Sequence, residues 1–164
     1  MKLAKPLIIV AAVLVIAGAL AYALTEKPAA PASTFTTLEG KSITLNDLRG
    51  KIVLVNFWAT SCPGCVKEMP GLIQTYSQYK DRGFEIVAVA MSYDPPNYVA
   101  NFAKTRQLPF PVALDVNGEH AHAFGDVQLT PTSFIIGKDG KIIEEKLGDL
   151  DFAKLKAMLD KELS

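Results

Sequence analysis

The chain has 164 residues, 49% of them hydrophobic, and a formal net charge of zero at pH 7. This length suits one globular domain with a complete hydrophobic core and is short for two domains of ordinary size. The balanced charge gives no sign of the strongly basic face that nucleic-acid binding requires. We therefore expect a single domain, a monomer, and no nucleic-acid partner.

Residues 6–24 are uncharged and almost wholly aliphatic. At about 1.5 Å rise per residue, a helix of this length comes close to the ~30 Å hydrocarbon core of a bilayer. Because Lys2 and Lys5 precede it, the positive-inside rule predicts a cytoplasmic tip and transmembrane anchor over residues 1–24, with the remainder extracytoplasmic. Two small-x-small triplets within residues 19–23 leave a cleaved signal peptide, and hence a secreted or periplasmic protein, as the alternative.

Residues 25–33 are rich in proline and alanine and predict a stiff linker that lifts a domain spanning 34–164 off the membrane. The domain begins with alternating apolar residues in two short segments, 34–38 and 41–45, around Glu39-Gly40. This pattern predicts an N-terminal β-hairpin.

A β-branched and aromatic run over residues 51–58 is typical of a strand buried on both faces. An apolar stripe from Cys65 through Tyr76 at helical spacing follows, and then a second buried-strand run at 84–90. Strand, helix and strand in this order predict a parallel β-α-β unit with a right-handed crossover. The cysteines then lie at the carboxyl end of a strand, where open α/β sheets place their sites.

The remaining elements are expected to be a helix over 97–107, a short strand at 112–114, a short helix over 117–125, an antiparallel pair at 132–136 and 141–147, and a final helix opened by Leu150-Asp151. The turn Lys138-Asp139-Gly140 joins the antiparallel pair.

Cys62 and Cys65 are the only cysteines, and they lie where the strand runs into the helix. A helix N-terminus stabilises a thiolate through its unpaired N–H groups and its dipole. A purely structural disulfide here would close so small a loop that it would contribute little stability. The pair therefore predicts redox chemistry. The alternative, a Cu(I)-binding assembly protein, lacks a plausible third ligand and a methionine cluster.

These features in combination resemble the thioredoxin fold, and within it the TlpA/ResA-like branch of membrane-anchored, extracytoplasmic thiol-disulfide oxidoreductases. The resemblance covers about residues 34–162 and rests on the N-terminal apolar segment, the hairpin leading into Leu45–Lys51, the run Val55–Thr60, Cys62-Pro63-Gly64-Cys65, and Thr130-Pro131. It implies an α/β fold with a central mixed sheet flanked by helices, an N-terminal hairpin extension, and an inserted helix around 95–107.

The resemblance also implies how the dithiol works. Cys62 is expected to be the nucleophile and Cys65 the resolving thiol, which together form a redox-active disulfide without a cofactor or metal. It further implies a reductant of specific client-protein disulfides, of the cytochrome c or copper-site maturation type. Electrons would come from a membrane thiol carrier.

Thioredoxins proper carry a buried acid six residues before the first cysteine, whereas this chain has Asn56 there. Since this branch carries a functional glutamate three residues after the second cysteine, we expect Glu68 to serve as the proton acceptor for Cys65. Its alternative role is an exposed first-turn acid that stabilises the helix N-terminus.

Four further residues are expected to contact substrate. Thr130 and Pro131 resemble the family's cis-proline loop, which faces the dithiol and can pair with an extended substrate strand. Trp58 is expected to pack against the dithiol and shape the docking surface, with a purely core role as its alternative. Pro63 lies in the first helical turn and tunes the thiolate.

Overall fold

A computed structural model describes residues 13–18, 20 and 26–164 of the chain. In chain order the elements are β1 (Thr34–Thr36), β2 (Ser42–Thr44), β3 (Ile52–Trp58), α2 (Pro63–Tyr79), the 3₁₀ helix η1 (Lys80–Arg82), β4 (Phe84–Ala90), α3 (Pro96–Arg106), β5 (Val112–Leu114), α4 (Glu119–Ala123), β6 (Thr132–Ile136), β7 (Ile142–Leu147) and α5 (Phe152–Glu162). The order confirms the expected elements, although α4 is shorter than the helix predicted over 117–125.

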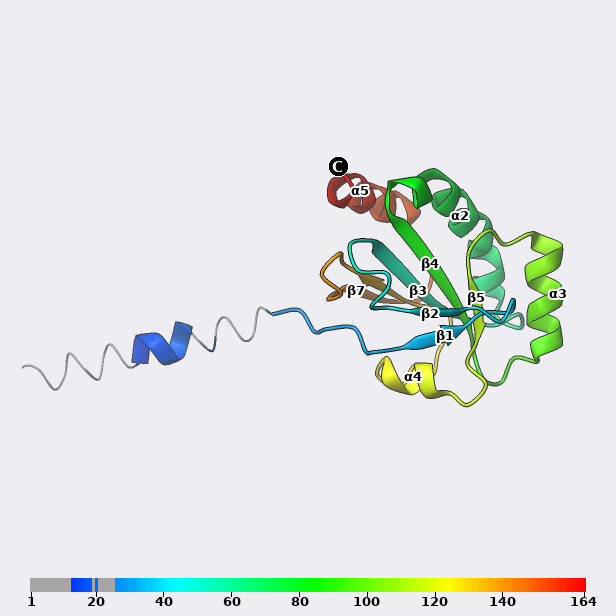
Figure 1. Cartoon of the computed structure of the whole chain (residues 1–164), viewed down its shortest axis with the longest axis horizontal. Helices are drawn as coiled ribbons and strands as arrows, with labels where there is room; N and C mark the ends of the chain where they lie inside the picture. The colour runs from blue at the N-terminus through cyan, green and yellow to red at the C-terminus, as the bar shows by residue number, and fades with distance from the viewer. Residues whose placement is uncertain (1–12, 19, 21–25) are drawn as a thin grey trace, which may run out of the picture.

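A five-stranded sheet in the order β5-β4-β3-β6-β7 forms the centre of the molecule (Figure 1). β3, β4 and β5 run parallel, while β6 and β7 are antiparallel to their neighbours. β1 and β2 pair in a separate antiparallel hairpin. The predicted mixed sheet with an N-terminal hairpin and an inserted helix, α3, is confirmed.

β3 is buried along its whole length, because the sheet is covered on both faces. Its side chains alternate between two apolar clusters: Ile52, Leu54 and Trp58 pack with residues of α2, α3 and α5, while Val53, Val55 and Phe57 face α4 and the β1–β2 hairpin. By this period of two, Asn56 faces α2. The alternation thus places a polar side chain beneath the helix that carries the cysteines.

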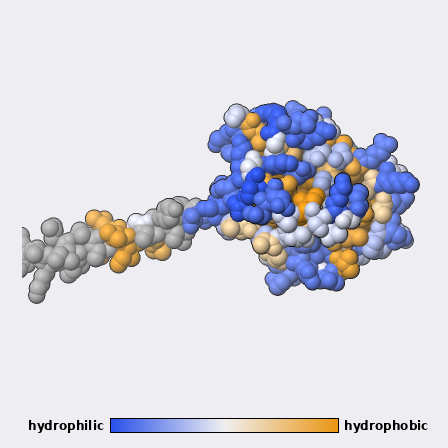
Figure 2. All heavy atoms as spheres, in the orientation of Figure 1, coloured by the Kyte–Doolittle hydropathy of each residue, from blue (hydrophilic) through white to orange (hydrophobic). Residues whose placement is uncertain are grey.

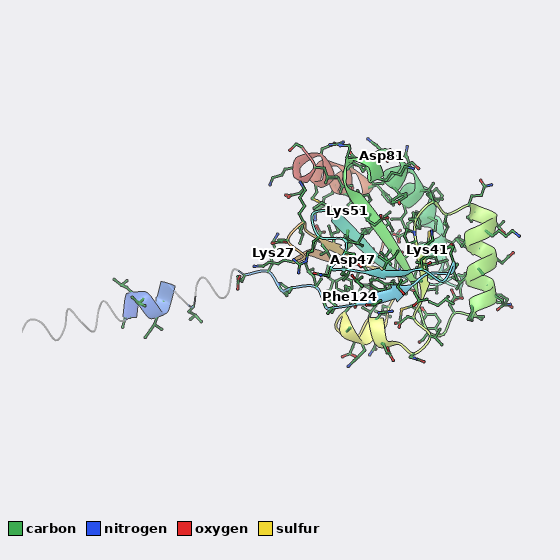
Figure 3. The ribbon with its side chains drawn as sticks, in the orientation of Figure 1. Lys27, Lys41, Asp47, Lys51, Asp81 and Phe124 are labelled. Atoms are coloured by element: carbon green, nitrogen blue, oxygen red, sulfur yellow. A yellow bond between two sulfur atoms is a disulfide. The ribbon has the colours of Figure 1, made fainter. Side chains whose placement is uncertain are left out.

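The face covered by α4 is an aromatic cluster. Phe124, labelled in Figure 3, directly follows α4 and lies 5.4 Å from Phe57 and 4.9 Å from Phe134, measured between ring centroids. Hydrophilic residues cover most of the visible surface of the domain, and hydrophobic residues show mainly near its centre (Figure 2). The helical residues 13–18 are exposed and largely hydrophobic.

α2 and α5 approach closely on the opposite face. A Cβ built on Gly71 of α2 would lie 2.4 Å from the ring of Phe152, the first residue of α5. Glycine at this position therefore permits the contact. The close packing holds the cysteine-bearing helix against both the sheet and the C-terminal helix.

The predicted linker does not run free along its whole length. Ile142 N donates to Pro28 O at 2.8 Å, Ala30 N donates to Gly140 O at 2.9 Å, and Ala29 forms a β-bridge with Lys141. The chain therefore joins the domain at the β6–β7 turn from about residue 28. Most of the predicted anchor, residues 6–24, lies outside the described residues, and within the described ranges no helix is long and apolar enough to cross a bilayer.

Candidate active site

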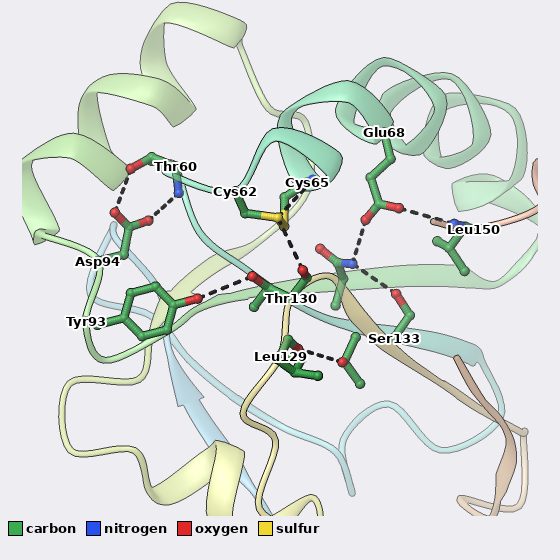
Figure 4. Close-up of a disulfide and its surroundings, with 12 residues drawn as sticks. Thr60, Cys62, Cys65, Glu68, Tyr93, Asp94, Leu129, Thr130, Ser133 and Leu150 are labelled. Carbon is green, nitrogen blue, oxygen red and sulfur yellow. Dashed lines mark hydrogen bonds between the residues drawn. A yellow bond between two sulfur atoms is a disulfide. The ribbon is translucent and has the colours of Figure 1, made fainter. Parts of the chain in front are cut away.

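Cys62 and Cys65 form a disulfide at the junction between β3 and α2, with Cα atoms 5.3 Å apart (Figure 4). Cys62 is the N-cap of the 17-residue helix α2, and its Sγ accepts a hydrogen bond from Cys65 N at 3.1 Å. Cys62 thus takes the position at which serine or aspartate commonly caps a helix. After reduction, this N–H and the helix dipole favour the thiolate of Cys62 over its thiol.

The two sulfurs differ in access. Cys65 is fully buried, whereas Cys62 is partly exposed and lies between two exposed residues, Ser61 and Pro63. An incoming disulfide therefore reaches Cys62 and not Cys65. This is the arrangement that the expected nucleophile and resolving thiol require.

Thr130 and Pro131 face the dithiol across the site, as expected, and the peptide bond between them is cis. Thr130 O lies 3.4 Å from Cys62 Sγ, and a Cβ built on Gly64 would lie 3.5 Å from Pro131 Cδ. A thiol at Cys62 donates to this carbonyl oxygen, whereas a thiolate is repelled by it. The carbonyl oxygen of Thr130 therefore favours the thiol form of Cys62, whereas the N–H of Cys65 favours its thiolate form.

Glu68 is buried, with 4% of its surface exposed, which excludes the alternative of an exposed first-turn acid. Its Oε1 accepts from Asn56 Nδ2 at 3.0 Å, and its Oε2 accepts from Leu150 N at 3.3 Å. Burial raises the pKa of Glu68 and is the largest effect; the two hydrogen bonds oppose it, and the negative charge of Asp149 adds to it. A carboxyl of this kind holds a proton to higher pH than a surface glutamate does.

Asn56 connects Glu68 to the neighbouring strand. Its Nδ2 also donates to Ser133 Oγ at 2.9 Å, and Ser133 is the residue opposite Asn56 in the β3–β6 register. Within the described part of the chain, Asn56 Oδ1 is buried without a hydrogen-bond partner. Sequence reasoning missed Ser133, because only the strand pairing brings it to the site.

Trp58 is fully buried, and its ring centroid lies 5.2 Å from that of Phe102 on α3. It belongs to the same apolar cluster as Cys65, which agrees with the expected packing next to the dithiol. No surface of Trp58 is open to a client in this structure, so any effect on docking acts through its neighbours. Pro63, by contrast, is exposed at the start of α2.

Tyr93 and Asp94, in the turn that follows β4, also reach the site, and the sequence singled out neither of them. Asp94 accepts hydrogen bonds from Thr60, and the hydroxyl of Tyr93 lies 3.2 Å from Thr130 Oγ1. The sequence placed both residues between the strand expected at 84–90 and the inserted helix expected around 95–107. The position of both residues just beyond the carboxyl end of a parallel strand was the one available signal.

Within the described residues, no group of three or more His, Cys, Asp or Glu side chains is placed to hold a metal ion. The chemistry that the arrangement supports is thiol-disulfide exchange, since it combines an accessible capped sulfur, a buried second sulfur and a buried carboxyl of raised pKa.

The Redoxin family model matches residues 25–159 of the chain. A thiol-disulfide oxidoreductase ResA from Bacillus thuringiensis is 45% identical over 132 residues, which cover 80% of this chain and 75% of the relative. The ResA of Bacillus subtilis is 38% identical over 127 residues, covering 77% and 70%.

Among solved structures, a thiol:disulfide interchange protein of the thioredoxin family from Chlorobium tepidum superposes with a TM-score of 0.77 at 30% identity, covering 85% of this chain and 99% of that one. The same fold thus accompanies the sequence similarity. The chain belongs to the Redoxin family, as a TlpA/ResA-like protein-disulfide oxidoreductase.

Proposed function

We propose that this oxidoreductase works on the extracytoplasmic side of the membrane as a reductant of specific client-protein disulfides, of the kind handled in cytochrome c or copper-site maturation. The observation that most supports the exchange mechanism is that Cys62 is partly exposed to solvent whereas Cys65 is fully buried. The names of the ResA relatives support the reaction class.

The exchange runs in two steps. The Cys62 thiolate attacks one sulfur of the client disulfide; a Cys62–client disulfide forms, and the other client sulfur leaves as a thiolate. The Cys65 thiolate then attacks Cys62 Sγ, which forms the Cys62–Cys65 disulfide and releases the second client thiolate. Two electrons pass to the client, and its two thiolates take up two protons. A membrane thiol carrier restores the dithiol by the same two steps.

The second step requires that Cys65 lose its proton in an apolar setting, since Cys65 is fully buried. Burial disfavours a thiolate, so a nearby proton acceptor lowers the barrier. Glu68, held by Asn56 and Leu150, is the buried carboxyl on the same helix face and serves this role. The site therefore extends one helical turn beyond the cysteine motif.

The point at which the chain enters the domain supports a tethered arrangement. Residues 28–30 pair with the turn between β6 and β7, and Ile136, at the β6 end of that turn, lies opposite Val53 near the start of β3. The dithiol follows the other end of β3, and seven strand residues separate the ends by roughly 20 Å. If residues before 26 lead to a membrane, the dithiol lies at the end of the sheet opposite the point where this tether joins the domain.

The test uses the reduced protein and an oxidised apocytochrome peptide that holds one Cys-x-x-Cys disulfide. We expect one peptide disulfide reduced for each protein disulfide formed, measured by acid quenching, alkylation and mass spectrometry. Cys65→Ser should stop at a Cys62–peptide adduct, and the Cys62→Ser/Cys65→Ser variant is the matched control. Absence of both transfer and adduct would overturn the proposal.

A further inference from the structure

The turn between β4 and α3 touches both segments that face the dithiol. Asp94 in this turn binds Thr60, two residues before Cys62, and its neighbour Tyr93 reaches Thr130, which precedes Pro131 (Figure 4). Two adjacent residues therefore tie the loop that leads to the nucleophile to the loop on the other side of the site.

The Asp94 contact is tight and shielded from water. The side chain is 4% exposed; its Oδ2 accepts from Thr60 N at 2.6 Å, and its Oδ1 accepts from Thr60 Oγ1 at 2.6 Å. Hydrogen bonds to a carboxylate are stronger than neutral ones, and both oxygens are used here. The contact fixes the backbone just before the N-cap of α2.

The Tyr93 contact is open to solvent. The residue is 56% exposed, while its hydroxyl is held 3.2 Å from Thr130 Oγ1. Leu129, on the other side of Thr130 along the chain, is 62% exposed. Thr130, whose carbonyl oxygen contacts Cys62, is thus flanked by the hydrogen-bonded ring of Tyr93 and by the aliphatic side chain of Leu129.

The large exposed apolar side chains of residues 26–164 all lie at one edge of the sheet, and they are Tyr93, Tyr98, Val116, Leu129 and Leu147. The first two follow β4 and the third follows β5, both parallel to β3. Leu129 precedes β6, and Leu147 ends β7 opposite Thr132, so the antiparallel strands bring them to the same edge. Apolar exposure concentrated around a reactive group is typical of an interaction surface.

We propose that the Tyr93–Asp94 turn is a substrate-binding element of this oxidoreductase, in which Asp94 positions the Cys62 loop and the ring of Tyr93 contacts an apolar side chain next to the client's cysteine. The client is then an extended polypeptide with an apolar residue beside its disulfide. The inference rests on the exchange reaction and holds whichever way electrons flow.

Tyr93 is tested with two otherwise identical disulfide peptides that carry leucine or serine beside the attacked cysteine. We expect Tyr93→Ser to lower the leucine-to-serine ratio of kcat/KM about tenfold, mainly through KM, since the lost contact is worth about 1.4 kcal/mol. Tyr93→Phe keeps the ring and should retain most of the ratio. Lys51→Ala, next to the start of β3 and thus at the end of that strand opposite the dithiol, is the control and should leave the ratio as it is.

An unchanged ratio in Tyr93→Ser, or an equal fall in Lys51→Ala, would overturn the assignment. Exchange with hydroxyethyl disulfide, measured on the same samples, reports the dithiol alone. Failure of the unsubstituted protein in that assay would contradict the exchange reaction, whereas a fall confined to the leucine peptide identifies the docking contact.

Asp94 is tested by Asp94→Asn, which places an amide nitrogen against one of the two donors of Thr60. We expect exchange with both peptides and with hydroxyethyl disulfide to slow by a similar factor, and the pH profile of Cys62 alkylation to shift. Thr60→Ser keeps both donors and is the control. An unchanged pH profile in a variant that melts like the parent protein would show that Asp94 serves the fold alone.

Discussion

The two ends of the central sheet are built from the same strands and do different things. At the carboxyl end of β3 lie the Cys62–Cys65 disulfide and the cis Thr130-Pro131 bond, together with a buried carboxyl. At the amino end lie a tight turn, the docked residues 28–30 and an ion pair between Lys51 and Glu85. Polar groups are buried and apolar groups exposed at the first end, while the second end follows the ordinary pattern for a surface.

At the carboxyl end of β3, the protein keeps groups that lower its stability but serve the exchange reaction. The buried carboxyl of Glu68 opposes folding, and so does the amide oxygen of Asn56, which has no hydrogen-bond partner among the described residues. At the amino end, Gly140 has φ 73°, and a Cβ at this position would collide with the side chain of Arg49. Substitutions at the first end should therefore change reactivity, and those at the second end should change stability alone.

The largest effect is expected from Cys62→Ser. Because Cys65 is buried and a serine hydroxyl does not attack disulfides, exchange should fall below detection in an assay with a disulfide peptide. The matched change at the other end, Lys51→Ala, should leave the exchange rate as it is. Residual exchange in Cys62→Ser would show that the buried sulfur is accessible after all.

Glu68→Gln should come next. It keeps the shape and removes the proton acceptor, so we expect the resolving step to slow on the order of 10²-fold, with the mixed disulfide accumulating in a quenched time course. The first step, attack by Cys62, should change less. Equal slowing of both steps would contradict a role confined to Cys65.

The same variant tests the pH dependence of stability. Burial raises the pKa of Glu68 above its ordinary value of about 4.5, so the unfolded chain releases this proton at lower pH than the folded protein. The stability linked to Glu68 is therefore fully present below that value and is lost as the pH rises through the raised pKa. Urea unfolding across this range should show the loss in the parent protein and a flatter profile in Glu68→Gln.

At the amino end, Gly140→Ala should lower the free energy of unfolding by about 1–2 kcal/mol without changing exchange, because φ 73° is unfavourable for alanine. Its Cβ would also lie 2.3 Å from the guanidinium carbon of Arg49. Gly50 has φ 87°, and a Cβ built on it would meet no atom of the described residues within 4 Å, so Gly50→Ala isolates the backbone cost. Equal losses in the two variants would mean that Arg49 moves aside freely.

The smallest effect is expected from Glu26→Ala, which removes the 2.8 Å ion pair with Lys141. Exposed ion pairs contribute about 0.2–1 kcal/mol, and this pair lies beside the strand pairing of residues 28–30. Chemical unfolding in low and high salt should show a small, salt-sensitive change. A loss above that range would indicate that the linker is a structural part of the domain.

The sequence by itself predicted much of the fold, because the signals are local. The continuous apolar run of β3, the helical stripe of α2 and the two-residue spacing of Cys62 and Cys65 all lie within about thirty consecutive residues. The placement of the dithiol at a strand's carboxyl end followed from that order alone. Glu68 was expected from the resemblance to the TlpA/ResA-like branch, which carries a glutamate three residues after the second cysteine, and its burial came from the structure.

Tertiary structure decided which groups surround the dithiol. Asn56 and Ser133 are 77 positions apart, Glu68 and Leu150 are 82 apart, and Thr60 and Asp94 are 34 apart. No local pattern encodes such contacts, since they depend on strand register and on how α2 lies over the sheet. For the same reason, the sequence left open whether Trp58 faces a client or the core, and packing against α3 placed it in the core.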